Sequence, residues 1–325
     1  MRSLERPAAR TARTQRRSPS ARDAFAQRLL RWYARHGRHD LPWRAARTPY
    51  RVTVSEFMLQ QTQVERVVPI FESFVARWPS WQQLADAATA DVVRAWKGLG
   101  YNARALRLHR LARAVIAHDG GELPRAPEVL AALPGIGPYT ARAIAAFAFE
   151  TDVVALDTNV RRIVHRTQLG LEWPPKVNAA TLDALARDLL PRGRAFAFNS
   201  ALMDLGATLC TARAPKCLLC PLRTGCRAAP VDAARLAERA AANARRRGSQ
   251  ATLRFEATDR YARGRIVDRL RALAGDETIA LGQLRRELGP LAAAPDRARF
   301  EGLVAALVRE GIVERSGRSV RLARS

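Results

Sequence analysis

All four cysteines of the chain fall in one short stretch, with the spacing Cys-x6-Cys-x2-Cys-x5-Cys. Thiolates are soft ligands that suit zinc or an iron–sulfur cluster, and the spacing alone does not choose between them. A pair of disulfides is the alternative, but the N-terminus carries no secretory signal and cytosolic thiols stay reduced. The sequence therefore predicts a loop pinned by a metal centre, with four ligands: Cys210, Cys217, Cys220 and Cys226.

The charge balance predicts a polyanionic partner. The 325 residues include 55 Lys and Arg against 30 Asp and Glu, a formal net charge of +25. A genome rich in Arg codons would explain Arg over Lys, but not the excess of positive over negative charge, so nucleic acid is the expected partner. No apolar run reaches the length of a membrane span. We expect no membrane partner and a cytoplasmic, nucleoid-associated protein.

The periodicity of apolar residues predicts a mainly α fold. Residues 1–22 are rich in Arg and Ser and are expected to form a disordered basic tail. Residues 23–227 have apolar positions at helical spacing and predict a multi-helix body, in which residues 210–226 form the cysteine loop. Residues 228–253, rich in Ala and Arg, are expected to be a linker, and residues 254–325 a small second domain.

The small domain has the pattern of a winged helix. Helical spacing covers 260–274, 281–288 and 297–310, and residues 311–322 then alternate around a Ser-Gly pair, as a hairpin does. Three helices and a hairpin are typical of relatives of the helix-turn-helix DNA readers. Such domains also serve as protein-interaction or spacer modules, and the sequence leaves both uses open.

A Gly-x-Gly pair flanked by prolines lies between two helical stretches, in Leu133–Ala141. Gly135 and Gly137 allow a tight turn that exposes backbone amides at the start of the next helix, where an anion binds. A helix–hairpin–helix element holds a DNA phosphate in this way, often with a bound monovalent cation. An ordinary helix–helix turn is the alternative.

Two acidic residues have environments suited to catalysis. Glu56 lies on an apolar helical face, where desolvation raises the pKa of a carboxyl and lets it act as a general acid. Asp157 follows an apolar run at a helix start, where a carboxylate can stabilise a developing positive charge. The plainer interpretations are a surface glutamate and a helix N-cap. After Glu56, Gln60, Gln61 and Thr62 form a polar group suited to contacts with base edges.

Residues 23–227 resemble the helix–hairpin–helix DNA glycosylases that carry an iron–sulfur cluster. Leu-Pro-Gly-Ile-Gly-Pro-Tyr-Thr-Ala, Leu-Asp-Thr-Asn-Val and the cysteine spacing match endonuclease III and its relatives. Met-Leu-Gln-Gln-Thr-Gln-Val at 58–64, Leu-Pro-Trp-Arg at 41–44 and Met-Asp-Leu-Gly-Ala at 203–207 resemble the MutY-type adenine glycosylases among them.

The resemblance implies a six-helix domain, a cluster domain and hydrolysis of the N-glycosidic bond of adenine mispaired with 8-oxoguanine or guanine. Glu56 would protonate a flipped-out adenine, Asp157 would stabilise the sugar cation, and the cysteines would hold a [4Fe-4S] cluster. Duplex DNA with a mispaired base is the implied substrate of a monomeric protein. The predicted DNA and substrate contacts are Leu41, Trp43, Arg44, Leu59, Gln60, Gln61, Thr62, Val64, Tyr101, Gly135, Gly137, Tyr139, Asn159 and Ser200.

Several positions depart from the patterns of the family. Tyr139 replaces the lysine that forms a Schiff base in the bifunctional enzymes, which implies a monofunctional glycosylase. Asn102 stands where a second tyrosine is common, and Ser200 stands where Gln or Glu often reads the adenine edge. The expected winged-helix-like tail resembles that of actinobacterial-type relatives and replaces the Nudix-like domain that recognises 8-oxoguanine elsewhere.

Two other functions remain open on the sequence. One is excision of thymine or uracil opposite guanine, since Tyr139 also occurs in mismatch glycosylases of this superfamily. The other is a non-catalytic DNA-binding iron–sulfur protein, against which Glu56 and Asp157 both count.

Overall fold

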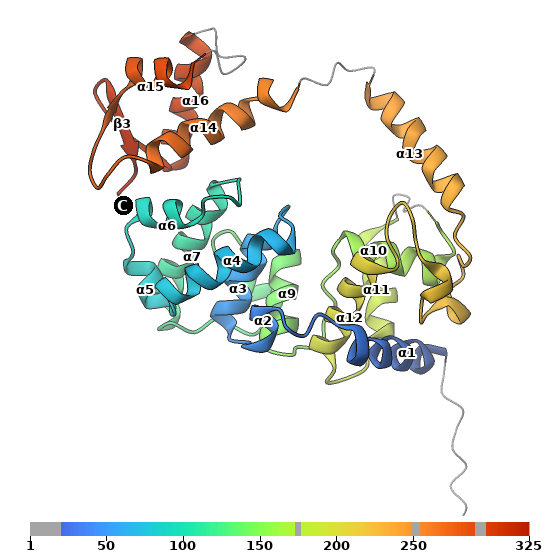
Figure 1. Ribbon diagram of the computed structural model, residues 1–325. Coiled ribbons are helices and arrows are strands. Elements are labelled where there is room, and N and C mark those ends of the chain that lie inside the picture. The colour runs from blue at the N-terminus through green and yellow to red at the C-terminus, as the bar shows by residue number, and fades with distance from the viewer. Residues whose placement is uncertain (1–20, 173–176, 249–253, 290–296, 325) are drawn as a thin grey trace, which may run out of the picture.

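The structure is a computed structural model that describes residues 21–172, 177–248, 254–289 and 297–324. It is mainly helical, as predicted, and consists of two helical lobes with a small C-terminal domain on the first lobe (Figure 1). Of the basic tail expected over 1–22, residues 1–20 lie outside the described part of the chain, and residues 21 and 22 already belong to the first helix. Among the described residues, no helix is long and apolar enough to cross a bilayer.

The first lobe is built from eight helices around an aromatic-rich core. Phe57, Phe71, Phe74 and Trp96 have almost no exposed surface there. Burying side chains of this size supplies the main driving force for folding. The helices are α2 (Pro42–Ala45), α3 (Pro49–Leu59), α4 (Val64–Arg77), α5 (Trp81–Asp86), α6 (Thr89–Ala95), α7 (Ala103–Asp119), α8 (Pro127–Leu130) and α9 (Pro138–Ala148).

The second lobe combines the first helix of the chain with the segment after α9. Its core centres on Phe198, Leu205 and Leu29, so α1 packs against α12 although the two are far apart in sequence. The helices are α1 (Ala21–His36), α10 (Thr158–Val164), η1 (His165–Leu169), α11 (Ala179–Leu189) and α12 (Ala195–Thr208), followed by the short turns η2 (Cys217–Leu219) and η3 (Arg223–Gly225). Helix α9 of the first lobe packs against both α3 and α12, and so joins the first lobe to the second.

The segment expected as a linker contains a helix, α13 (Ala233–Gly248). Asp232 Oδ1 accepts hydrogen bonds from the amides of Ala234 and Arg235 at 2.9 and 3.1 Å, which satisfies two free donors at the helix start. The run that follows is rich in alanine, the strongest helix former. Figure 1 shows α13 leading away from the second lobe, whereas the C-terminal domain that follows in sequence lies on the first lobe.

The C-terminal domain contains the three predicted helices and the predicted hairpin. Strands β2 (Val313–Ser316) and β3 (Ser319–Leu322) pair antiparallel, with Val313 opposite Leu322. A strand that was not predicted, β1 (Ile279–Ala280), pairs with the other side of β3 and gives the order β1-β3-β2. The helical elements are η4 (Phe255–Ala257), α14 (Asp259–Arg271), α15 (Leu281–Leu288) and α16 (Arg297–Glu310).

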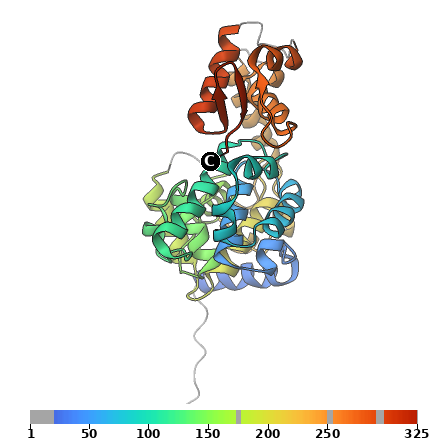
Figure 2. The same cartoon turned by 90° about the vertical axis from the view of Figure 1, so that its left-hand side faces the viewer.

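The C-terminal domain shares a core with the first lobe and stands at one end of the molecule (Figure 2). Ala90, Val93 and Leu106 of the first lobe belong to the same apolar cluster as Leu270 and Leu307. The shared core fixes the domain against α6 and α7.

Candidate active site

Helix α3 places Glu56 in the interior between the lobes. The side chain of Thr48 accepts from the amide of Arg51 and caps the helix start, and consecutive residues from Val52 to Met58 are buried on all sides. Glu56 is therefore only 7% exposed. A surface glutamate, the plainer interpretation of the sequence, is wrong.

Glu56 and Tyr139 meet across the packed pair α3 and α9. Tyr139 Oη donates to Glu56 Oε2 at 3.3 Å. Burial raises the pKa of Glu56 to about 7, the hydrogen bond from Tyr139 lowers it in part, and the charge of Asp157 raises it again. Burial and the same two carboxylates hold the pKa of Tyr139 well above its usual value, so the phenol stays protonated. Near neutral pH, Glu56 can carry a proton and donate it.

Asp157 caps helix α10 and also faces the cavity. Its Oδ1 accepts from the amide of Val160 at 2.6 Å, and its Oδ2 accepts from Asn159 Nδ2 at 3.1 Å. Burial nevertheless raises the pKa of Asp157. Helix α10 lies close against α12 at Gly206, where any Cβ would come within 2.5 Å of Asn159 Cβ. The close packing of the two helices fixes the position of the carboxylate.

These groups line a cavity of about 250 Å³ between the lobes. Its wall is apolar apart from the acidic pair, Tyr139 and a few polar groups, which is the usual make-up of a pocket for one small, flat ligand. Ten of the predicted site residues meet there: Leu41, Trp43, Arg44, Glu56, Leu59, Thr62, Val64, Tyr139, Asp157 and Asn159.

The remaining predicted residues lie elsewhere. Gln61 and Tyr101 line a neighbouring cleft, Gln60 ends α3 as its C-cap, and Gly135 and Gly137 form the turn before α9. Ser200 is fully buried in α12 and is not among the residues that line the cavity. The structure thus does not bring Ser200 to the site.

Asn199, the neighbour of Ser200 on α12, has a structural role. Its side-chain oxygen accepts from the amide of Ala155 at 2.8 Å, and its Nδ2 donates to the carbonyls of Val153 and Ala195. These bonds tie the run before Asp157 to α12.

Sequence reasoning missed the cavity-lining side chains of Val52, Ser55, Phe147 and Phe196, which carry no signal beyond apolar or small character.

Asp204, also missed as a site residue, anchors the edge of the cavity. Its carboxylate accepts from Arg44 at 2.7 and 3.1 Å and from Arg38 Nε at 2.7 Å. Burial alone would raise the pKa of Asp204, but the two guanidiniums hold it below its usual range. Asp204 thus fixes Arg44, which lines the cavity, to the second lobe.

We expect Asp204→Ala to lower the free energy of unfolding by about 3–5 kcal/mol, because it leaves the buried charge of Arg44 without a partner. Urea unfolding followed by circular dichroism measures this, with Asp204→Asn as a milder variant if the alanine variant does not fold. Asp188→Ala is the control, because Asp188 forms an exposed ion pair with Arg22, worth less than about 1 kcal/mol. Equal losses of unfolding free energy in the two alanine variants would contradict the role of Asp204 as the buried partner of Arg44.

A buried arginine, Arg104, holds the polar turn after α3. Its guanidinium donates to the carbonyls of Phe57 and Leu99 at 2.9 Å and to Thr62 Oγ1 at 3.1 Å. Burial lowers the pKa of Arg104 to about 10, so it stays charged. Gln61 in this turn has φ 55°, and Tyr101, in the separate turn before α7 that Arg104 also contacts through the carbonyls of Leu99 and Gly100, has φ 44°, so both are non-glycine residues in the left-handed region. Such strain persists only where the surroundings enforce it, and it is typical of functional loops.

The Gly-x-Gly turn has the expected form of an anion site. Gly135 has φ +78°, and a Cβ there would lie 2.9 Å from Arg107 Cβ, so only glycine fits. Gly137 is the N-cap of α9 and Pro138 its first residue. Both glycines are exposed at the start of this 11-residue helix, and Tyr139, its second residue, lines the active-site cavity.

The four cysteines line one small cavity at the end of α12. Each is free and partly buried. Arg166, which is almost fully buried, donates to Cys210 Sγ at 3.3 Å. Among the described side chains, no three His, Cys, Asp or Glu converge closely enough to hold a single metal ion. Four thiolates are a donor set that suits either zinc or a four-iron cluster.

Comparison with known proteins confirms the predicted resemblance. The family described as "HhH-GPD superfamily base excision DNA repair protein" matches residues 54–187. An adenine DNA glycosylase of Mycolicibacterium smegmatis is 40% identical over 89% of this chain and 92% of its own, and one of Mycobacterium tuberculosis is 47% identical over 75% and 77%. The structure of a thermostable thymine-DNA glycosylase, 31% identical, covers 64% of this chain and 96% of its own with a TM-score of 0.59. The chain therefore belongs to the adenine DNA glycosylases of the HhH-GPD base excision repair superfamily.

Proposed function

We propose that this enzyme removes adenine mispaired with 8-oxoguanine or guanine from duplex DNA by hydrolysing its N-glycosidic bond. The observation that carries the proposal is the protonatable Glu56, placed with Tyr139 and Asp157 around a cavity of about 250 Å³. A pocket with apolar walls, one acid and one carboxylate suits a flipped-out base and the sugar attached to it.

The two carboxylates take different roles. Protonated Glu56 donates its proton to the adenine ring, which leaves with the electron pair of the breaking bond. The anionic carboxylate of Asp157 stabilises the positive charge that develops on the sugar, and water then adds to the anomeric carbon. Tyr139 lies where a lyase needs an amine, and a phenol forms no Schiff base, so the enzyme is monofunctional.

The polar turn and the Gly-x-Gly turn would hold the DNA. Gln61 enters the stack where the adenine has left, and the amides at the start of α9 bind a backbone phosphate, with a monovalent cation at Gly135–Gly137. Cys210, Cys217, Cys220 and Cys226 would hold a [4Fe-4S] cluster, which pins the loop that carries Arg213 and Lys216. The negative charge of such a cluster suits its buried neighbours Arg162 and Arg166. The enzyme would act as a monomer on nucleoid DNA.

Single-turnover excision on labelled duplexes with A:8-oxoguanine, A:G, T:G, U:G and A:T tests the function. We expect release of adenine from the first two duplexes only, with strand cleavage only after alkali. Release of thymine or uracil opposite guanine would instead assign the enzyme to the mismatch class. Binding of every duplex with no release would support a non-catalytic protein.

The pH dependence of kcat/KM follows from the raised pKa of Glu56. The acid form is present below a pKa of about 7, so we expect the rate constant to fall tenfold per pH unit above that value. Tyr139→Phe removes a hydrogen bond that lowers this pKa, so its profile should shift to higher pH. A rate constant that rises or stays level between pH 6 and 8.5 would contradict the role of Glu56 as acid.

Replacing one of the four cysteines tests for the cluster by metal content and stability, without an activity assay. We expect Cys220→Ser to be purified with less iron and without the visible absorbance of an iron–sulfur cluster, and to unfold at a lower temperature. Thr224→Ser, in the same loop, keeps the hydroxyl that accepts from Arg28 and should retain four irons per chain. Stoichiometric zinc in the wild-type protein would overturn the proposal.

A further inference from the structure

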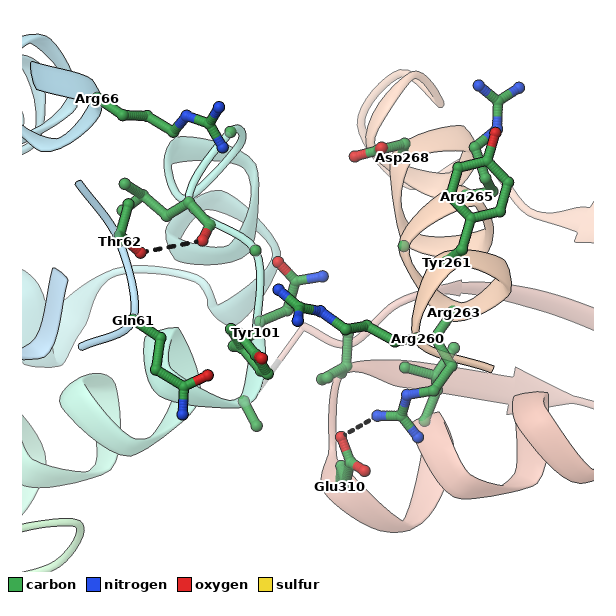
Figure 3. Close-up of a pocket in the computed structure, with 18 of the residues that line it drawn as sticks. Gln61, Thr62, Arg66, Tyr101, Arg260, Tyr261, Arg263, Arg265, Asp268 and Glu310 are labelled. Carbon is green, nitrogen blue, oxygen red and sulfur yellow. Dashed lines mark hydrogen bonds and ion pairs between the residues drawn. The ribbon is translucent and has the colours of Figure 1, made fainter. Parts of the chain in front are cut away.

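A second and larger hollow, of about 850 Å³, lies between the first lobe and helix α14 of the C-terminal domain. One wall consists of the Gln61–Thr62 turn, the Gly100–Tyr101 turn and the start of α4, and the opposite wall consists of α14 (Figure 3). Thr62 lines both this cleft and the active-site cavity. The two hollows therefore adjoin at Thr62, in the turn that carries Gln61.

The cleft is strongly basic. Arg66, Arg107, Arg260, Arg263 and Arg265 line it against two carboxylates, Asp268 and Glu310. Both carboxylates are already paired, Glu310 with Arg263 at 2.5 Å and Asp268 with Arg271 at 2.7 Å. Within the described residues, no carboxylate pairs with Arg66, Arg260 or Arg265. Cations without partners on facing walls create a field that attracts a polyanion.

Aromatic side chains are interleaved with these cations. The guanidinium of Arg260 lies 3.9 Å from the ring centroid of Tyr101 and 5.8 Å from that of Phe255. Tyr101 is 38% exposed and Phe255 54%, and both line the cleft. Exposed rings alternating with arginines are the elements that bind nucleic acid, by stacking on bases and by contacting phosphates.

The C-terminal domain is held in place by contacts made elsewhere. Arg271 donates to the carbonyl of Val93 at 3.0 Å and to Asn102 Oδ1 at 2.7 Å. Arg94 donates to the carbonyls of Leu273 and Gly275 at 3.4 and 3.3 Å. Asn102, the position that departs from the family pattern beside Tyr101, thus joins the two domains. Helix α14 is a fixed wall whose Arg260 and Arg265 remain available to a ligand.

We propose that this cleft binds the DNA strand that carries the partner of the target base, and that Arg260 and Arg265 of the C-terminal domain contact its phosphates. The identity of the two strands rests on the proposed base-flipping function. When adenine enters the cavity on one side of the Gln61 turn, its former partner stays in the stack on the other side, and the cleft lies next to that turn. Arg260 leaves the ring of Tyr101 to contact a phosphate, and the ring is then free to stack on a base.

The test is equilibrium binding of a duplex with a hydrolysis-resistant 2′-fluorinated adenosine opposite guanine, measured by fluorescence anisotropy over a range of salt. We expect Arg260→Ala/Arg265→Ala to weaken binding about 10- to 100-fold at low salt, and to reduce the slope of log affinity against log salt by about 1.8, as two lost phosphate contacts require. The corresponding double lysine variant should recover most of the affinity. Arg286→Ala, an exposed arginine of α15 outside the cleft, is the control.

Neutral methylphosphonate linkages, placed in one DNA strand at a time, identify which strand the cleft binds. Placed in the partner strand beside the mispair, they should weaken binding by the wild type but not weaken binding by the double alanine variant further. Placed in the adenine strand, they should weaken both proteins equally. A double alanine variant that matches the control, or a non-additive effect confined to the adenine strand, would overturn the proposal. If the wild type releases no adenine, the proposed function fails while the salt slope still decides whether the cleft binds DNA.

Discussion

Glu56→Gln is expected to slow single-turnover adenine release by about 100- to 10,000-fold, because the amide keeps the shape of the side chain but supplies no proton. Binding of the mispaired duplex should stay within about threefold of the wild type, since Glu56 is inside the cavity and not on the phosphate-binding surface. Quench-flow or gel-based excision at saturating enzyme measures the first quantity, and anisotropy the second.

The control for this prediction is Glu72→Gln on α4, which changes the same chemical group at an exposed position.

The stability of the Glu56 variant gives an independent check. A carboxyl whose folded-state pKa is raised to about 7 destabilises the fold as pH rises through the range between its unfolded pKa and 7. Glu56→Gln should therefore be more stable than the wild type above pH 7, by up to about 3 kcal/mol. Unchanged excision by this variant would remove Glu56 from the mechanism.

Much of the site could be predicted because its chemistry is carried by short segments. Glu56, Tyr139 and Asp157 belong to three such segments, and each lies on the cavity wall. The secondary structure could be predicted because its signals are also local. Apolar residues with a period of 3.6 predict α16, and alternation around Ser-Gly predicts the hairpin. Helix α13 was missed although its signals, an Asp cap and an alanine run, were also local.

The positions that sequence reasoning missed depend on contacts between distant residues. Asp204 and Arg44 are 160 residues apart, and Arg271 and Asn102 are 169 apart. The segment around Asp204 matches the family, but nothing near it in the sequence says which side chains it pairs with. Its partners Arg38 and Arg44 come from the segment after α1 and from α2. The structure does not place Ser200 on the cavity wall for a similar reason. Which side of α12 faces the cavity is decided by packing against neighbouring elements and not by the residues next to Ser200 in sequence.

Asp157→Asn separates the two interpretations of Asp157. As a helix cap, asparagine is about as good as aspartate, so a purely structural role predicts no loss of excision and no loss of stability. If the charge stabilises the sugar cation, we expect excision to slow by about 100- to 1,000-fold, the cost of removing one electrostatic contact with the developing charge. Single-turnover rates on the A:G duplex distinguish the two.

The direction of the stability change strengthens the test. Burial raises the pKa of Asp157 despite its hydrogen bonds, which means that the folded state disfavours the charge at neutral pH. Removing the charge should therefore leave the melting temperature at pH 7 unchanged or higher while activity falls. That combination is the signature of a group kept at some expense of stability for its chemistry. Wild-type excision together with an unchanged melting temperature would return Asp157 to the role of a cap.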